Sequence, residues 1–273
     1  MKAYMSHGLS WVKEHIYIAV ILFLYQLLWG FFVYRFIDGT VLPVLQRYPD
    51  PAPTEMTARL FLAESQFHLM KTNDYLPFLW TLAAFIFIRL LLTPFIRAGV
   101  FYSMARQSGS GLAFFEGIKS IWKPMLLLYW VETVLIALPA YWFIPHAVRQ
   151  FTDRPTLAAV MTDIVPYAAL WLLGAWVVRQ LFLSMQFGAA SELSILHALL
   201  QGIRRMAPLL GLSAIFAGIA LLSGLLFTAA AMLWTGLTAL ILQQAFPAVR
   251  TLLQLWGLSS RYSVWQQSGT EDK

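Results

Sequence analysis

The chain alternates between long apolar segments and short polar connections, a pattern typical of helices that cross a lipid bilayer. Such a helix needs roughly 20 mostly apolar residues, because about 30 Å of hydrocarbon is covered at 1.5 Å per residue. The fold class is therefore predicted to be all-α, a polytopic membrane helix bundle of about six transmembrane helices. The six spans are expected at about residues 16–36, 76–96, 124–144, 164–187, 208–227 and 235–257.

Three local features refine these boundaries. The first apolar run is too long for the core of a signal peptide, and no small-residue cleavage site follows it, so a retained span is expected. Pro139 predicts a kink in the third span, since proline cannot donate the helical hydrogen bond. Residues 208–242 carry no charge and are too long for one helix. A tight turn is therefore expected between spans five and six.

The long connection over residues 38–74 is expected to carry a short helix. Thr54 can cap this helix near Glu55. Apolar residues then recur at helical spacing, which favours a helix lying on the membrane surface or over the bundle; they are Met56, Leu60, Phe67 and Met70.

Two other connections resemble each other. Residues 116–119 read EGIK and lead to Pro124, while residues 201–204 read QGIR and lead to Pro208. Each is a basic amphipathic segment followed by a proline that opens an apolar helix. The pattern predicts an internal repeat of span, interfacial helix and span.

Composition supports lipid as the solvent for this chain. Of the 273 residues, 59% are hydrophobic and 12% are charged. A soluble domain of this size could not hide so much apolar surface. The chain has no cysteine, which excludes disulfides, thiolate metal sites and cysteine nucleophiles.

The net charge of +6 first suggests nucleic acid, but the charges divide by membrane side. The N-terminus, residues 97–123, residues 188–207 and the tail at 258–273 carry ten basic and five acidic residues. The opposite connections carry six basic and seven acidic residues. Basic connections mark the cytoplasmic side. Both termini are thus expected in the cytoplasm, and nucleic acid is not an expected partner.

Four charged residues fall inside predicted spans. Arg89, Arg179 and Arg250 lie in spans two, four and six, and Glu132 lies in span three. A charge at the centre of a bilayer costs about 2.5–3.5 kcal/mol on insertion scales, so each needs a partner or a route to water. An intramembrane ion pair is predicted between Arg89 and Glu132, which lie at similar depth on consecutive antiparallel helices.

Arg179 and Arg250 leave two interpretations open. Their long side chains can reach the cytoplasmic headgroups, which would make them structural. Alternatively, they form a candidate site for anionic lipid, a positively charged pocket that receives a lipid phosphate.

No constellation typical of catalysis occurs. His68, Asp74, His146 and Asp163 are scattered over the outer connections without the spacing of metal ligands. No phosphate-binding glycine loop, nucleophile elbow or dinucleotide fingerprint is found. We therefore expect no catalytic residue, no metal and no cofactor, and a protein that is not an enzyme.

The repeated unit, with its Gly-Ile-Lys or Gly-Ile-Arg segment, resembles bacterial six-helix membrane families of unassigned function. It is similar to the membrane domain attached to some glycerophosphodiester phosphodiesterases. The resemblance covers roughly residues 76–262 and implies a bacterial cytoplasmic membrane. It does not carry over the phosphodiesterase activity, because the chain has no room for the soluble catalytic domain.

The function expected from these features is that of a non-enzymatic multi-pass membrane protein. It would bind or handle anionic lipid, or assist an envelope protein, with membrane lipids as partners and a protein partner in the membrane left open. The alternative is a transporter or the permease subunit of a transport complex, which would explain the repetition and the intramembrane charge. Against it, the apolar helices have few interruptions besides Pro94, Pro139 and Pro247.

Overall fold

The computed structural model describes residues 2–46, 76–106, 111–153, 157–233 and 237–271. Within these ranges every regular element is a helix, which confirms the all-α fold class. The helices are α1 (Lys2–Glu14), α2 (Ile16–Gln46), α4 (Leu76–Arg106), α5 (Leu112–Ala137), α6 (Ala140–Asp153), α7 (Leu157–Ala190), α8 (Ile195–Arg204), α9 (Met206–Leu233) and α10 (Leu237–Glu271).

The chain is a multi-pass membrane protein. Five stretches of the described residues are long and apolar enough to cross a bilayer: Ile16–Gly39, Leu76–Arg106, Leu112–Gln150, Met161–Ala190 and Met206–Leu233. Helices suit this environment because all their backbone groups are satisfied internally. The predicted sixth span, at about 235–257, begins among undescribed residues and stays a prediction.

Several helix boundaries differ from those expected. α4 continues through Pro94 to Arg106, beyond the predicted end at residue 96. α9 extends to Leu233, past the predicted end at 227, and residues 234–236 after it are not described. The expected interruption at Pro139 is present, because α5 ends at Ala137 and α6 begins at Ala140. The helix predicted near Glu55 lies outside the described residues.

The two segments proposed as an internal repeat differ in local structure. Residues 116–119 belong to α5, which runs on through Pro124 without a break. Residues 201–204 end α8, and Arg205 leaves helical geometry before α9 begins at Met206. The repeat itself stays a prediction.

The structure divides into two compact units, Ile21–Leu92 and a larger one formed by Met1–Val20 with Thr93–Lys273. In the smaller unit, aromatic side chains join α2 to α4. The ring of Phe85 stacks on Phe32 with centroids 5.6 Å apart and meets Phe36 edge-on at 6.3 Å. Such pairs add to the stability gained from buried area.

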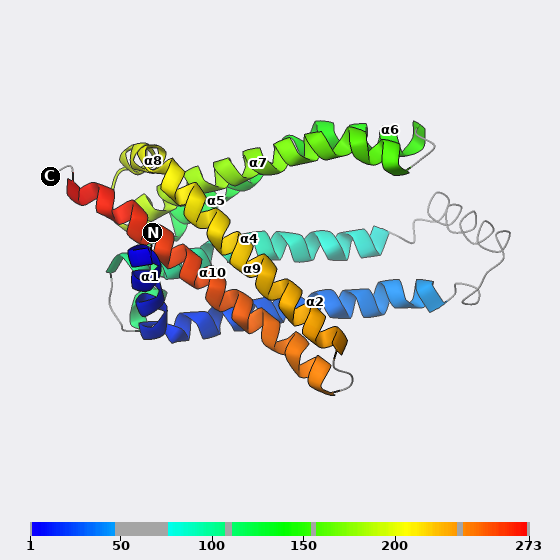
Figure 1. The fold of residues 1–273 in the computed structure, drawn as a ribbon, viewed down its shortest axis with the longest axis horizontal. Coiled ribbons are helices and arrows are strands. Elements are labelled where there is room, and N and C mark those ends of the chain that lie inside the picture. The colour runs from blue at the N-terminus through cyan, green and yellow to red at the C-terminus, as the bar shows by residue number, and fades with distance from the viewer. Residues whose placement is uncertain (1, 47–75, 107–110, 154–156, 234–236, 272–273) are drawn as a thin grey trace. The chain divides into compact units, whose positions relative to one another are not determined.

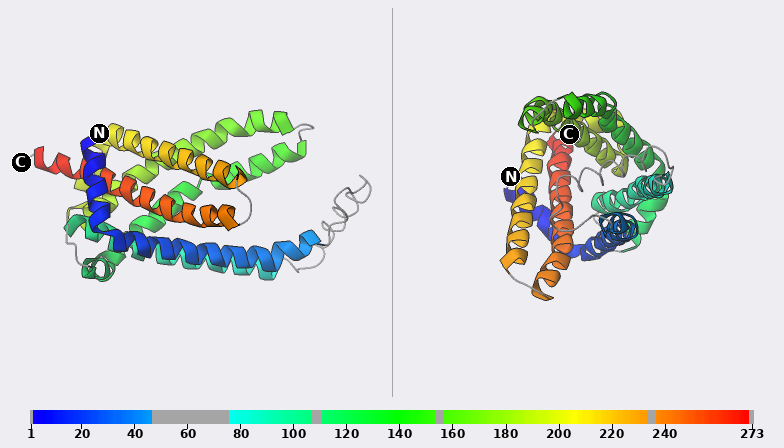
Figure 2. Two further views of the ribbon diagram at one scale, coloured as in Figure 1. Left: turned by 60° about the horizontal axis from the view of Figure 1, so that its bottom comes forward. Right: turned by 90° about the vertical axis from the view of Figure 1, so that its right-hand side faces the viewer.

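In the larger unit, α9 and α10 lie side by side and α1 crosses α10 (Figures 1 and 2). The Trp256 indole donates to the Met5 carbonyl at 2.7 Å, and the Ser259 hydroxyl donates to the Gly8 carbonyl at 3.0 Å. The Tyr4 hydroxyl also donates to the Gln267 amide oxygen at 2.8 Å. These contacts hold the first and last helices together at one end of the unit.

The turn between α7 and α8 sets the direction of α8. Glu192 has a φ of 59°, and the Leu193 N–H donates to the Gly188 carbonyl at 3.0 Å, as at a helix C-terminus closed by a left-handed residue. The Ser194 hydroxyl then caps α8 by accepting from the His197 N–H at 3.3 Å. α8 consequently folds back onto α7, and Gly202 contacts the Ser184 side chain.

Candidate functional site: a cluster of arginines around a buried carboxylate

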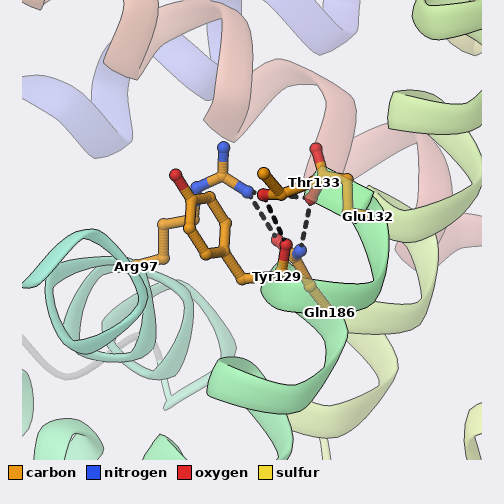
Figure 3. Close-up of polar contacts among 5 residues, drawn as sticks. All are labelled: Arg97, Tyr129, Glu132, Thr133 and Gln186. Atoms are coloured by element: carbon orange, nitrogen blue, oxygen red, sulfur yellow. Dashed lines mark hydrogen bonds and ion pairs between the residues drawn. The ribbon is translucent and has the colours of Figure 1, made fainter. Parts of the chain in front are cut away.

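A buried carboxylate joins three helices of the larger unit. Glu132 on α5 is 5% exposed, and one of its oxygens accepts two hydrogen bonds. Arg97 Nη1 on α4 donates at 3.1 Å, and Gln186 Nε2 on α7 donates at 3.0 Å (Figure 3). The same Arg97 nitrogen reaches Gln186 Oε1 at 3.4 Å, which closes a three-residue network.

Arg97 also contacts an aromatic ring on α5. Tyr129 lies one helical turn before Glu132 on α5, so both side chains project from one face. The Arg97 guanidinium lies over the Tyr129 ring, 4.8 Å from its centroid (Figure 3). A cation over an aromatic face is stabilised by the ring quadrupole. Arg97 thus has a carboxylate, an amide and a ring as partners.

Two further arginines are close enough to interact electrostatically with this network. Arg179 on α7 interacts with Arg97, Glu132 and Tyr129. Arg261 on α10 interacts with Arg179 and Arg97. We call Arg97, Arg179 and Arg261 the arginine cluster. Its three positive charges come from three helices, and two of them, Arg97 and Arg179, interact with the Glu132 carboxylate.

The members of the cluster differ in how far they are neutralised. Arg97 forms its ion pair with Glu132. Arg179 is exposed, and its guanidinium makes no hydrogen bond or ion pair with any residue that the structure describes. Arg261 is half-buried and donates from Nε to the Gly257 carbonyl at 2.9 Å, a bond to its own helix. Two of the three charges therefore have no paired carboxylate in the described ranges.

The pKa of Arg261 is lowered by its burial and by nearby positive charges. It lies beyond the predicted end of span six at residue 257. Burial, and then repulsion by Arg179 and Arg97, lowers the pKa of Arg261 to about 10. The side chain is therefore still charged at neutral pH, and an anion placed beside it would relieve both effects.

The sequence-predicted residues are only partly brought together. Glu132 is buried and forms its ion pair with Arg97. Arg179 interacts with Glu132 electrostatically. Arg89 is exposed and belongs to the smaller unit, so its predicted pair with Glu132 stays a prediction. Arg250 is exposed on α10. It precedes Arg261 by about three helical turns, so both lie on nearly one face but about 16 Å apart along the axis.

Sequence reasoning missed Arg97, Gln186 and Arg261. The sequence predicts that both arginines lie in cytoplasmic connections, because hydropathy falls near residues 97 and 258. In the structure, α4 and α10 continue well past these points. Gln186 carries a signal that could have been used: it follows Arg179 by about two helical turns and therefore shares its face.

Among the residues that the structure describes, the other polar side chains do not form a second site of this kind. His68 and Asp74 lie outside the described residues. His146 packs its ring against Tyr167 at 5.4 Å. Throughout the described ranges, no three His, Asp or Glu side chains are grouped so that they could hold a metal ion. A shallow hollow beside His146 is lined by residues of α6 and the arginine cluster takes no part in it.

No protein family, curated protein or solved structure matches this chain. The resemblance to bacterial six-helix membrane families stays a prediction.

Proposed function

We propose that this multi-pass membrane protein binds an anionic headgroup of a membrane lipid at the arginine cluster and catalyses no reaction there. The observation that carries the proposal is the charge of the site. Arg97 on α4 is paired with Glu132, Arg179 on α7 interacts electrostatically with both of them, and Arg261 on α10 interacts with the two arginines. A phosphate group is the ligand that such a set of donors fits best, because guanidinium offers a planar fork of N–H groups.

The place of the cluster along the helices supports a lipid as the source of the anion. Arg97 and Arg261 follow closely after the predicted ends of spans two and six, and Gln186 lies at the predicted end of span four. All three therefore fall near one membrane boundary, on the side whose connections are rich in lysine and arginine. Arg179 lies eight residues before the predicted end of span four, about 12 Å deeper. Basic pockets between helices on the cytoplasmic side commonly bind acidic lipid headgroups.

Lipid retention by purified protein tests the proposal. Wild type, Arg179→Gln and Lys119→Gln would be purified in a mild detergent, and bound phospholipid quantified by mass spectrometry. Lys119 is an exposed lysine on α5, on the same predicted side, so its variant controls for the loss of one positive charge. We expect wild type and Lys119→Gln to retain anionic lipid in preference to zwitterionic lipid. Arg179→Gln should retain about tenfold less anionic lipid than the wild type.

An Arg250→Gln variant distinguishes the arginine cluster from the pocket of Arg179 and Arg250 that the sequence suggests. Because Arg250 is not among the charges acting on Arg179, its loss should leave retention near the wild-type level. Loss of lipid from Arg250→Gln and not from Arg179→Gln would place the site at Arg250 and not at the arginine cluster. Equal retention of zwitterionic and anionic lipid by the wild type would refute lipid recognition altogether.

A further inference from the structure

The ion pair of Arg97 and Glu132 uses only one atom of each charged group. Arg97 Nη1 donates to Glu132 Oε2 at 3.1 Å, and Gln186 Nε2 donates to the same oxygen at 3.0 Å. Nε and Nη2 of Arg97 and Oε1 of Glu132 make no hydrogen bond with any residue that the structure describes. Both charged groups therefore keep hydrogen-bonding capacity beyond the pair.

The unbonded atoms are open to a ligand. The Arg97 side chain is partly exposed. Within the described ranges, neither Arg97 nor Glu132 contributes to the side-chain atoms that are fully enclosed and lack a partner. Figure 3 shows the second carboxylate oxygen of Glu132 and a second guanidinium nitrogen of Arg97 pointing away from Gln186, on one side of the ion pair. A set of donors and an acceptor thus lie next to each other.

Neighbouring groups hold both side chains in place. The Arg97 guanidinium lies over the Tyr129 ring, 4.8 Å from its centroid, and the fully buried Gln186 binds the paired carboxylate oxygen. A group that is already fixed loses little freedom when a ligand binds, which favours affinity. The unbonded Nε and Nη2 form a planar fork that matches two oxygens of a phosphate.

A ligand that uses both groups needs an oxyanion and a hydrogen-bond donor close together. The oxyanion would accept from Arg97, and an O–H or N–H beside it would donate to Glu132 Oε1. A hydroxyl is favoured over an ammonium, because Arg97 already matches the charge of Glu132. A headgroup with an ammonium would also be zwitterionic, whereas the proposed ligand is anionic.

We propose that Arg97 and Glu132 together select an anionic lipid whose phosphodiester carries a polyol headgroup. Arg97 binds the phosphate through Nε and Nη2, and Glu132 Oε1 accepts from a headgroup hydroxyl. Gln186 and Tyr129 are positioning residues. The inference rests on the proposed function, because it names the headgroup class that the same site would take.

A competition between lipids with the same acyl chains tests the inference. The full-length protein would be equilibrated in mixed micelles of phosphatidylglycerol, phosphatidylethanol, phosphatidylethanolamine and phosphatidylcholine, and bound lipid measured by native mass spectrometry. Phosphatidylethanol has the phosphodiester charge of phosphatidylglycerol but no hydroxyl. We expect the wild type to favour phosphatidylglycerol over phosphatidylethanol by about tenfold, the effect of one hydrogen bond to a charged group. Both should bind above the two zwitterionic lipids.

Variants of Glu132 test the hydroxyl contact. Glu132→Met removes the acceptor and should abolish the preference between the two anionic lipids. Glu132→Gln keeps a neutral acceptor, and because charge-assisted hydrogen bonds are about twice as strong as neutral ones, the preference should fall to about threefold. Glu116→Gln changes an exposed glutamate of the same helix and should keep the wild-type preference. If Glu132→Met does not fold, an unchanged preference in Glu132→Gln would still refute the contact.

Arg97→Lys tests the phosphate contact. It keeps the positive charge beside Glu132 but removes the planar fork, so both anionic lipids should bind about tenfold more weakly. Arg106→Lys makes the same substitution at an exposed position of α4 and should bind both lipids as the wild type does. Unchanged binding by Arg97→Lys would remove the phosphate from Arg97.

The results with wild type separate the inference from the proposed function. Equal binding of phosphatidylglycerol and phosphatidylethanol, each above phosphatidylcholine, would overturn the polyol selection and leave anionic lipid binding standing. No preference for either over phosphatidylcholine would overturn both. Stronger binding of phosphatidylethanolamine than of phosphatidylglycerol would give Glu132 an ammonium partner and contradict both.

A last arm identifies the source of the headgroup. Glycerophosphoglycerol carries the headgroup of phosphatidylglycerol without the acyl chains, and we expect that millimolar concentrations do not displace the bound lipid. If it displaces the lipid and raises the melting temperature as much as phosphatidylglycerol does, the headgroup selection stands and the lipid part of the proposed function falls.

Discussion

Glu132 accepts a hydrogen bond from Arg97 at 3.1 Å, although the two residues lie on different helices and only Glu132 falls inside a predicted span. The Arg97 side chain is 24% exposed and that of Glu132 is 6% exposed. This ion pair is therefore shielded from water by protein, and Gln186 shields it further by donating to the same carboxylate oxygen.

The first prediction concerns this pair. Breaking a buried ion pair by removing one partner typically costs about 3–5 kcal/mol, whereas removing both charges together can be nearly neutral. Arg97→Leu and Glu132→Gln should each lower the melting temperature in detergent, and the double variant should lose less than the sum of the two. The measurement is a double-mutant cycle by thermal unfolding.

The same cycle with Arg89→Leu in place of Arg97→Leu tests the pair expected from the sequence. We expect the losses of melting temperature to add for Arg89→Leu with Glu132→Gln and to fall short of the sum for Arg97→Leu with Glu132→Gln. That result would identify Arg97 as the partner of the Glu132 carboxylate. Coupling confined to Arg89 would contradict the arrangement around Glu132.

The second prediction concerns the contact between α7 and α8. A Cβ at Gly202 would collide with the Ser184 side chain, so Gly202→Leu forces the two helices apart. Overpacking of this kind typically costs about 1–3 kcal/mol. The variant should unfold at a lower temperature than wild type and should expose α8 to proteolysis.

A matched control is available on α7 itself. A Cβ at Gly174 meets no atom within 4 Å, so Gly174→Leu makes the same substitution at an open helical position. It should be neutral or slightly stabilising, because leucine is favoured over glycine in helices by roughly 1 kcal/mol. Equal destabilisation by both substitutions would show that the Gly202 contact is not the cause.

The third prediction is a dependence of stability on alkaline pH. Burial raises the pKa of Tyr262, partly offset by its hydrogen bond with Ser191 at 3.2 Å. The phenol therefore keeps its proton in the folded protein at pH values where the unfolded chain, with its ordinary pKa near 10, loses it. This contribution to stability is complete below pH 10 and is lost as the pH rises from 10 through the folded-state pKa.

Tyr262→Phe isolates that contribution because phenylalanine does not titrate. Melting temperatures of wild type and variant would be compared from pH 8 to pH 11. We expect the wild type to lose stability relative to the variant above pH 10. A constant difference across the range would mean that Tyr262 has the same pKa in both states. Arg261 titrates near pH 10 with the opposite sign, but it is common to both proteins and cancels in the comparison.

Much of the fold could be predicted from the sequence because lipid imposes one strong rule. Apolar runs of sufficient length become helices, and five stretches of the described residues are long and apolar enough to cross a bilayer. Hydropathy does not say where such a helix stops, however. α4 and α10 carry charged residues beyond their apolar parts and stay helical, which places Arg97 and Arg261 on rigid elements and not in loops.

The candidate site could be predicted only in part for the same reason. Intramembrane charge singled out Glu132 and Arg179, and both belong to the arrangement described above. Their neighbours depend on which helices contact one another, and a pattern along one helix carries no such information. The pairing of α10 with α1 and α9, for example, rests on contacts such as that between Trp256 and Met5, far apart in the sequence.

The last prediction concerns the side of the membrane on which the two termini lie. Tyr4 and Gln267 are hydrogen-bonded, so the first and last helices must share one side. The excess of basic residues in the connections near them predicts that this side is the cytoplasm. Because the chain has no cysteine, single cysteines can be introduced and labelled without background. We would make Tyr4→Cys, Gln267→Cys and, on exposed α6, Val148→Cys.

A membrane-impermeant maleimide applied to intact cells should label Val148→Cys and spare the other two. Applied to inverted membrane vesicles, it should label Tyr4→Cys and Gln267→Cys and spare Val148→Cys. Labelling of all three from both sides would indicate leaky membranes, so a cysteine-containing cytoplasmic protein serves as the control for integrity. Opposite results for Tyr4→Cys and Gln267→Cys would contradict the contact between α1 and α10. Labelling of both Tyr4→Cys and Gln267→Cys from outside the cell would be consistent with that contact but would reverse the orientation of the protein. The arginine cluster would then lie at the outer face of the membrane. The acidic lipids of the cytoplasmic leaflet could not supply its ligand there.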